Sequence, residues 1–313
     1  MIYPANFEEK IGFDRIREQV TALCSTPSAK AKLAEEGFST SADEIERRLS
    51  LMNEMRSLLM LERDFPDGDY PDPAPLVAKI RVEGSYLLAA EADQLRKALV
   101  TVGAIAEFIL GRGGARYPRL WELSRRVTLF PEIVRAIDAI LDDRGEVKDS
   151  ASPELQQVRR AIREREGQAA KRLQQVLQRA KQAGIVDADA VLSVRDGRPV
   201  IPVAAANKRK LQGFIHDESA TGRTFYVEPV EVVEINNELK ELEYAERREV
   251  VKVLSAFTES IRPDAEAIAD AGDYLSSVDM IRAKARWALA NDAGKPILST
   301  DDRLEPVSYT HLT

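Results

Sequence analysis

A long stretch without a helix-breaking residue constrains the fold of this chain more than any other feature. Ser152 is a good N-cap, Pro153 suits the first helical position, and no further proline or strong breaker follows until Gly184. This pattern predicts one helix of about 30 residues. Its apolar positions form only a narrow stripe, so the helix needs a partner along its length. The stripe consists of Leu155, Val158, Ile162, Ala169, Leu173, Val176 and Ala180.

A second helix of matching length follows in the sequence. Pro229 can open it, and it can run to Ile261 or Arg262, just before Pro263. The short insert between the two helices, residues 185–228, must leave and return at nearly the same place. We therefore expect the two helices to run antiparallel. The apolar seam of the second helix contains Ile235, Leu239, Leu242, Val250, Leu254, Phe257 and Ile261.

The insert between the helices has the alternating pattern of β-structure. Four short strands are expected, over residues 191–195, 198–203, 211–216 and 223–227. Asp196-Gly197 favours a type I′ hairpin turn between the first two strands, and residues 220–222 are a turn candidate between the last two. The pattern predicts a small antiparallel β-meander at the tip of the helix pair.

Residues 1 to about 150 are expected to form shorter helices joined by loops. Ser41 to Glu44 is a capping-box pattern, in which the Ser41 hydroxyl accepts from the Glu44 N–H and the Glu44 carboxylate reaches back. The helix that starts there should end before residues 64–75, which contain four prolines. A second apolar helix, about residues 90–110, should stop at the glycines of residues 111–114. The fold class is therefore mainly α: a helical core with two long antiparallel helices that carry a small antiparallel sheet.

Basic residues concentrate in the turns of the insert. Residues 195–223 contain six cations and three anions, a net charge of +3. Flexible cations in a loop can contact successive phosphates and release counterions. The alternative is that the basic loop only blunts an exposed sheet edge and keeps the tip soluble. The candidate nucleic-acid contacts are Arg195, Arg198, Lys208, Arg209, Lys210 and Arg223. Nothing in the pattern indicates recognition of base edges, so binding should be independent of sequence.

No constellation of residues predicts a catalytic, cofactor or metal site in this chain. His216, Asp217 and Ser219 are poorly spaced for a triad, because consecutive strand residues point to opposite faces. Two histidines and one cysteine cannot supply a zinc site of the usual spacing. Gly294-Lys295 lacks both the first glycine and the hydroxyl residue of a phosphate-binding loop. The chain itself is therefore expected to be no enzyme.

Charge and hydropathy bound the cellular setting. The formal net charge of −7 means that any contact with nucleic acid must be local. The longest apolar run, residues 98–106, is far shorter than the roughly 18 to 20 residues of a membrane span. Charged residues follow within the first ten positions, where a secretory signal needs an apolar segment. With Cys24 alone, no intrachain disulfide can form. We expect a cytoplasmic protein without a membrane partner.

Several motifs in fixed order give the chain a family resemblance. The motifs are LSVRDGRPVIPV at 192–203, GFIHDESATG at 213–222, FYVEP at 225–229 and NNEL at 236–239. This succession resembles the second bacterial subfamily of the MutS DNA mismatch-repair family, the recombination-suppressing endonuclease type. The segments Phe13-Asp14 and Ala283 to Arg286 resemble the core of the same family, and the resemblance covers nearly all of residues 7–305.

The resemblance implies a division into core, levers and clamp. The expected parts are a helical core over 1–150, an outbound lever helix over 151–184, a β-rich clamp over 185–228, a return lever helix over 229–262, a continued helical core over 263–305 and an atypical tail over 306–313. The family implies a homodimer that encloses duplex or branched DNA, and in some members action on ribosomes and ribosomal RNA. It also implies an ATPase domain that uses ATP and magnesium and, in some members, a nuclease domain.

Two functions remain open from the sequence. The resemblance favours a nucleic-acid clamp whose basic residues contact the backbone, in a parent protein that acts in recombination or mismatch-repair control, or in rescue of stalled ribosomes. The alternative is a coiled-coil scaffold that binds protein through the narrow helical seam. The sequence shows no phosphate-binding loop, and Pro306 to Thr313 depart from the family pattern, so we expect a truncated or foreign tail.

Overall fold

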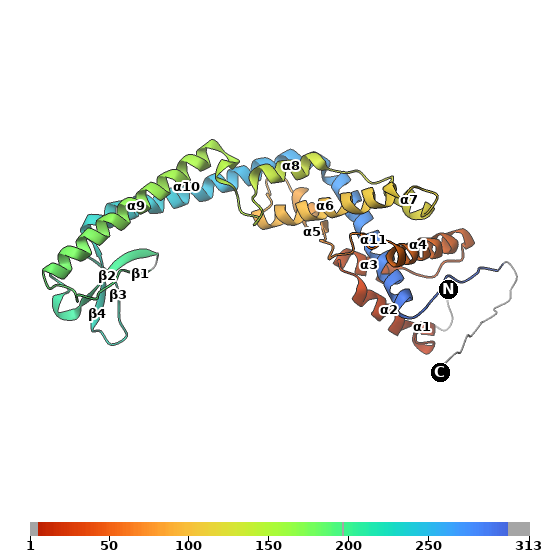
Figure 1. Ribbon diagram of the computed structural model, residues 1–313, viewed down its shortest axis with the longest axis horizontal. Coiled ribbons are helices and arrows are strands. Elements are labelled where there is room, and N and C mark those ends of the chain that lie inside the picture. The colour runs from red at the N-terminus through yellow and green to blue at the C-terminus, as the bar shows by residue number, and fades with distance from the viewer. Residues whose placement is uncertain (1–5, 196, 300–313) are drawn as a thin grey trace. The chain divides into compact units, whose positions relative to one another are not determined.

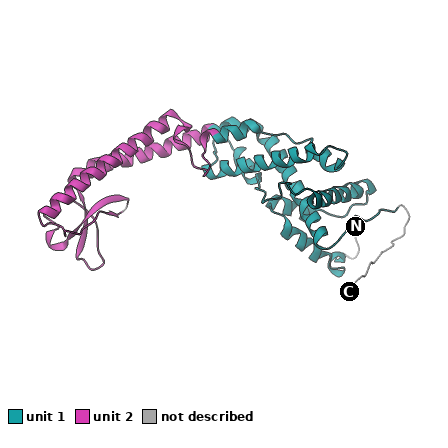
Figure 2. Cartoon of the chain, viewed as in Figure 1, with its two compact units in different colours: residues 1–138, 257–313 teal, residues 139–256 magenta. Residues whose placement is uncertain are grey.

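The computed structural model describes residues 6–195 and 197–299 and divides the chain into two compact units (Figure 2). Within the described residues, unit 1 contains the chain through Asp138 and again from Phe257 onward, and unit 2 contains Ala139–Ala256. The fold is mostly helical with a small antiparallel sheet, as predicted. Asp196 of the predicted hairpin turn, His311 and the atypical tail lie outside the described residues.

Unit 1 is built around its last helix, α11 (Ala265–Ala290), which packs against five other helices of this unit, α2 to α6. The α11 side chains Leu275 and Val278 are fully buried, in one core with Met55 of α4 and Ile105 of α6. Figure 1 labels these helices. The other elements of this unit are α1 (Phe7–Lys10), α2 (Phe13–Leu23), α3 (Pro27–Glu35), α4 (Ala42–Leu61), α5 (Ala74–Ile80), α6 (Ala89–Gly111), α7 (Pro118–Ser124), α8 (Pro131–Ile140), which ends in unit 2, and the 3-10 turn η3 (Arg262–Asp264).

Local signals predict the ends of α4 and α6 to within a few residues, but one predicted contact at the start of α4 is wrong. Ser41 caps α4, and its hydroxyl accepts from the Glu44 N–H at 3.4 Å, as predicted. The reciprocal half of the capping box is wrong: the Glu44 carboxylate binds Arg47 and Arg48 of the following turn. Two cations at i+3 and i+4 offer charge-assisted bonds that a neutral backbone N–H cannot match.

Unit 2 contains the long helix α9 (Pro153–Gln182), most of a second long helix, α10 (Val230–Ile261), whose last five residues belong to unit 1, and the 3-10 turn η1 (Asp149–Ala151). The Ser152 hydroxyl caps α9 by accepting from the Leu155 N–H at 3.0 Å, as predicted. Pro229 does not open α10: it is the last residue of the preceding strand. Proline has no backbone N–H to donate, so it is found at strand ends, where a missing donor does not interrupt the ladder of hydrogen bonds.

Ion pairs show that α9 and α10 run antiparallel, side by side as in Figure 1. The pairs are Arg159–Glu246 at 2.7 Å, Arg165–Glu238 at 2.8 Å and Arg179–Glu231 at 3.5 Å, so positions rise along one helix as they fall along the other. The two helices are also complementary in composition. The α9 sequence has eight basic and three acidic residues, whereas α10 has eight acidic and four basic residues.

The sheet of unit 2 has four antiparallel strands in the order β1-β2-β4-β3. They are β1 (Ser193–Arg195), β2 (Arg198–Ala204), β3 (Gly213–Glu218) and β4 (Thr224–Pro229). The predicted meander is therefore wrong, because β2 pairs with β4 and not with β3. The connection after β2 contains the 3-10 turn η2 (Ala205–Asn207) and is long enough to carry β3 to the far side of β4.

One face of the sheet is buried against α9. Ile201 and Val203 of β2 and Val227 of β4 are fully buried, in one core with Leu173 and Val176 of α9. Ile201 lies opposite Val227 in the ladder, so these side chains share a face. Burial of this face fixes the register of the sheet, since a slip by one residue would turn every apolar side chain outward.

Candidate nucleic-acid interface

The loop that follows β2 carries three consecutive exposed cations, Lys208, Arg209 and Lys210. The Lys208 ammonium lies 4.3 Å from the centre of the Phe225 ring, a cation–π contact that leaves the charge available. Arg209 and Lys210 form no ion pair with any residue that the structure describes. The Asn207 side chain anchors the loop by donating to the Ile185 carbonyl at 3.0 Å.

Arg223 lies at the end of the sheet where this loop leaves β2. It is exposed, and its carbonyl accepts from the Ala205 N–H at 2.9 Å, next to the last ladder pair, Ala204 and Thr224. The point where β2 ends therefore meets the point where β4 begins. Two of the six predicted contacts, Arg223 and Lys208, thus lie near this end of the sheet, as does the exposed Glu218 of β3, opposite Phe225 in the ladder. Two more, Arg209 and Lys210, follow Lys208 in the connection that leads to Gly213, where β3 starts opposite Pro229. We call these four cations the sheet-end cluster.

The other two predicted contacts lie at the opposite end of β2, where Arg195 and Arg198 face each other across the β1–β2 hairpin. Arg195 pairs with Asp217 at 2.9 Å and stacks on Tyr226, with its guanidinium carbon 3.7 Å from the ring centre. Its charge is therefore partly compensated. The structure does not bring all six predicted residues into one patch.

Arg198 is turned toward a buried carboxylate, that of Glu228, which is only 1% exposed. One Arg198 nitrogen lies 2.9 Å from each Glu228 oxygen, and the other donates to the Asn237 side chain at 3.1 Å. The Glu228 carboxylate also contacts His216 Nε2 at 2.5 Å and accepts from the Asn236 amide at 2.6 Å. Arg198 is thus engaged in holding β2 to β4 and α10, and its side chain is 24% exposed.

Burial alone would raise the pKa of the Glu228 carboxyl, but hydrogen bonds from Asn236, His216 and Arg198 outweigh burial and lower the pKa below its ordinary value. Glu228 is therefore an ionised group at neutral pH, surrounded by donors. Sequence inspection missed this polar cluster of Arg198, His216, Glu228, Asn236 and Asn237. Its signal was present in the motifs at 213–222, 225–229 and 236–239, each of which contributes a member.

The histidine, aspartate and serine that superficially suggest a triad have three different partners. His216 contacts Glu228, Asp217 pairs with Arg195, and the Ser219 hydroxyl accepts from the Thr224 N–H at 3.1 Å. This agrees with the unfavourable spacing in the sequence. Among the described residues, no three His, Cys, Asp or Glu side chains are grouped so that they could hold a metal ion.

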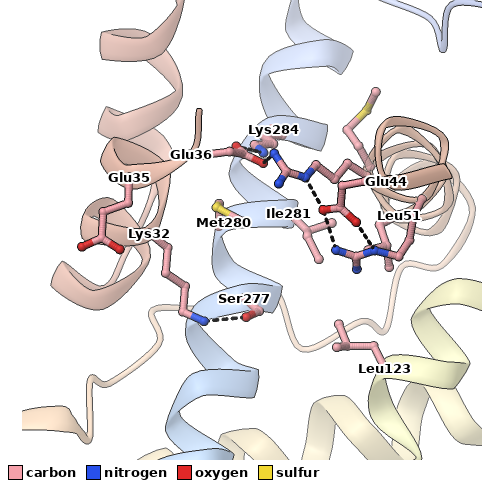
Figure 3. A pocket seen from close by; sticks show the side chains of 13 residues that line it. Lys32, Glu35, Glu36, Glu44, Leu51, Leu123, Ser277, Met280, Ile281 and Lys284 are labelled. Carbon is pink, nitrogen blue, oxygen red and sulfur yellow. Dashed lines mark hydrogen bonds and ion pairs between the residues drawn. The ribbon is translucent and has the colours of Figure 1, made fainter. Parts of the chain in front are cut away.

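Unit 1 contains a pocket between α3, α4 and α11, with a cavity volume of about 320 Å³ (Figure 3). Its charged side chains are largely paired with one another. Lys32 donates to Ser277 at 2.9 Å, Lys284 binds Glu36, and Arg48 bridges Glu44 and Glu36. These pairs satisfy the charges that a ligand would otherwise use, so the sheet-end cluster is the better candidate interface. No helix of the described chain has the length and apolarity that a membrane span requires.

Comparison with known proteins relates most of the chain to one group. It is 30% identical over 291 residues to the "Endonuclease MutS2" of Bacillus velezensis, covering 92% of this chain and 37% of that protein. It is 32% identical over 300 residues to the "Endonuclease MutS2" of Thermomicrobium roseum, and 29% identical over 289 residues to the "Putative endonuclease MutS2" of Bacillus subtilis. No family model matches the chain. The chain thus spans about 37% of the length of these relatives, and the resemblance seen in its motifs is confirmed.

Proposed function

We infer, from the relation of this chain to the MutS2 endonucleases, that it is a nucleic-acid-binding part of a MutS-type protein. The sheet of unit 2 would be the clamp, and its sheet-end cluster would contact the phosphate backbone without regard to base sequence. The single observation that carries this proposal is that Lys208, Arg209 and Lys210 on the connection after β2, and Arg223 just before β4, are all exposed and form no ion pair with a described residue.

The physical support for backbone contact is electrostatic. A nucleic acid carries counterions that are condensed on its phosphates. When exposed lysine and arginine side chains neutralise these phosphates, the counterions are released, and this release favours binding. Arg195 and Arg198 have less to offer, because Asp217 and Glu228 already compensate them. The proposal therefore assigns backbone contact to the sheet-end cluster, and assigns Arg198 to positioning the sheet.

The long helices would have a mechanical role in the whole protein. We propose that α9 and α10 are the levers that carry the state of an ATPase domain, using ATP and magnesium, to the clamp. The whole protein would act as a homodimer on duplex or branched DNA, or on ribosomal RNA. It would serve recombination or mismatch-repair control, or the rescue of stalled ribosomes, and would be cytoplasmic.

The scaffold alternative is less favoured. The buried apolar residues of α9, such as Leu173 and Val176, contact the sheet and Val232 of the same chain, and three ion pairs join α9 to α10. The seam that a protein partner would need is therefore largely occupied from within.

Replacing Lys208, Arg209 and Lys210 together by alanine tests the proposed interface. We expect weaker binding to duplex DNA, branched DNA and structured RNA alike. The plot of log affinity against log salt concentration should become less steep by about 2 to 3, at about 1 per lost phosphate contact. Fluorescence anisotropy over a salt series measures both quantities. A control variant with three exposed arginines of unit 1 replaced, Arg15, Arg47 and Arg135, loses the same charge elsewhere. Equal binding by the two variants would refute the proposed interface.

A further inference from the structure

The segment that joins α6 to α7 and continues to Arg126 is unusually basic for its surroundings. Residues 111–126 contain five arginines and one glutamate, a net charge of +4. The other described residues of unit 1, residues 6–110, 127–138 and 257–299, have a net charge of −9. Such a concentration within an acidic unit requires an explanation beyond general solubility. We call residues 111–126 the arginine segment. Its arginines are Arg112, Arg116, Arg119, Arg125 and Arg126.

Aromatic rings hold three of these guanidinium groups in place. The guanidinium carbon of Arg112 lies 3.6 Å from the centre of the Phe108 ring, that of Arg125 lies 5.3 Å from Trp121, and that of Arg116 lies 5.5 Å from Tyr117. A stacked guanidinium keeps the N–H groups on its edge free for in-plane hydrogen bonds. The stacking also reduces the side-chain entropy that would be lost on binding an anion.

Nearby carboxylates compensate only part of this charge. Glu62 pairs with Arg112 at 3.2 Å and Arg116 at 2.8 Å, and Glu122 pairs with Arg125 at 2.7 Å and with Arg126. One carboxylate thus serves two arginines in each case. The side chains of Arg116 and Arg125 are 52% exposed and that of Arg126 is 72% exposed, so their remaining donors face solvent.

Arg119 forms no ion pair with any described residue. The Glu54 carboxylate of α4 instead accepts from the backbone N–H groups of Arg119 and Leu120, both at 2.9 Å. This arrangement fixes the start of α7 with a carboxylate and leaves the Arg119 side chain exposed, with Glu46 and Glu54 near enough to compensate its charge only in part. The buried residues Tyr117 and Leu120 anchor the α6–α7 junction in the core of unit 1.

We propose that the arginine segment is a second surface for the phosphate backbone of a nucleic acid, separate from the sheet-end cluster. Planar guanidinium groups bind phosphate oxygens through two parallel N–H donors, and five of them within 15 residues match a ligand with repeated phosphates better than a single anion. The surface presents no groups arranged for base edges, so it binds DNA or RNA by backbone alone. This inference rests on the proposed function only in that both assign a nucleic-acid ligand.

The test replaces Arg119, Arg125 and Arg126 with alanine in the chain as it stands. These three side chains are exposed, so circular dichroism melting should show an unchanged fold. Anisotropy titrations with duplex DNA, branched DNA and an RNA hairpin should show affinity roughly tenfold lower at low salt, and a salt slope lower by about 2 to 3. The three ligands distinguish DNA from RNA as the source of the backbone.

Two comparison variants separate this inference from the proposed function. The control variant at Arg15, Arg47 and Arg135 should bind like the native chain, and the variant at Lys208, Arg209 and Lys210 reports on the sheet end. Weakening by the sheet-end variant, with the arginine-segment variant equal to the control, would overturn this inference and leave the proposed function intact. Weakening by the arginine-segment variant alone would support this inference and refute the sheet end. Failure of the native chain to bind any of the three ligands at low salt would overturn both.

Discussion

At the residue scale, the buried Glu228 carboxylate is the most informative group in unit 2. It joins Arg198 of β2, His216 of β3 and Asn236 of α10 around one charge. Removing one partner of a buried ion pair leaves the other charge uncompensated, and this lowers the free energy of unfolding by more than the intact pair contributes to it. Glu228 therefore holds the sheet at the start of α10, and we expect the sheet-end cluster to depend on it only through this positioning.

Replacing Glu228 with glutamine should make unit 2 less stable and its stability less sensitive to acid. The lowered pKa of the native carboxyl stabilises the fold above its unfolded pKa of about 4.3, and this contribution is lost as pH falls through the lower folded pKa. The loss on substitution should be on the order of 3 kcal/mol at neutral pH. Urea denaturation from pH 7 to pH 3 measures it, with the exposed Glu241→Gln as control. Parallel pH profiles for the native chain and Glu228→Gln would contradict this role.

At the element scale, the helix ends could be predicted from the sequence, because nearby residues determine them. The strand order could not, because it depends on contacts between distant segments. The Ser152 cap and the glycines after α6 act within a few residues, so the helix ends were predictable. Strand order depends on which strand β2 meets, and a contact between Ile201 and Val227 leaves no local trace. Similarly, the basic residues of the sheet-end cluster could be recognised in the sequence. The ion pair of Arg198 with Glu228, 30 residues away, could not be predicted.

Gly167 provides a test of helix α9 as an element. It lies in the interior of the helix, and a Cβ added there would meet nothing within 4 Å. Glycine weakens a helix interior by roughly 0.5 to 1 kcal/mol relative to alanine, so Gly167→Ala should stabilise unit 2 by about that amount. Thermal and chemical denaturation measure the gain. Gly184, just after α9, has φ +63°, so Gly184→Ala should have the opposite sign. A loss of stability in Gly167→Ala would show that a tight contact or a bend requires the glycine.

At the scale of the whole molecule, charge is divided unevenly between the two units. The sequence of unit 2, residues 139–256, has no net charge, and the described part of unit 1 is net negative. The chain as a whole therefore offers no general attraction for a polyanion, and the binding that we propose depends on the local charge of the sheet-end cluster and the arginine segment.

Nucleic acid should therefore stabilise the chain only where salt is low. We expect duplex DNA to raise the melting temperature at about 50 mM salt and to have little effect at about 200 mM, because affinity falls steeply with salt over this range. Differential scanning fluorimetry with and without DNA measures the shift. The sheet-end and arginine-segment variants should each show a smaller shift than the control variant. A shift of equal size at both salt concentrations would argue for a ligand held by apolar contacts.

The opposite charges of α9 and α10 have a consequence for the order of events during synthesis. The basic helix α9 leaves the ribosome well before the acidic helix that neutralises it, and the Arg159–Glu246 pair joins residues 87 positions apart. The Arg179–Glu231 pair, close to the sheet, closes the shortest loop and so has the lowest entropic cost. Once the four strands have formed, we expect the ion pairs between α9 and α10 to form first near the sheet and then progressively farther from it. Until then, we expect Asp149 to compensate only Arg159 and Arg163, so most of the positive charge of α9 stays open to an anion such as ribosomal RNA.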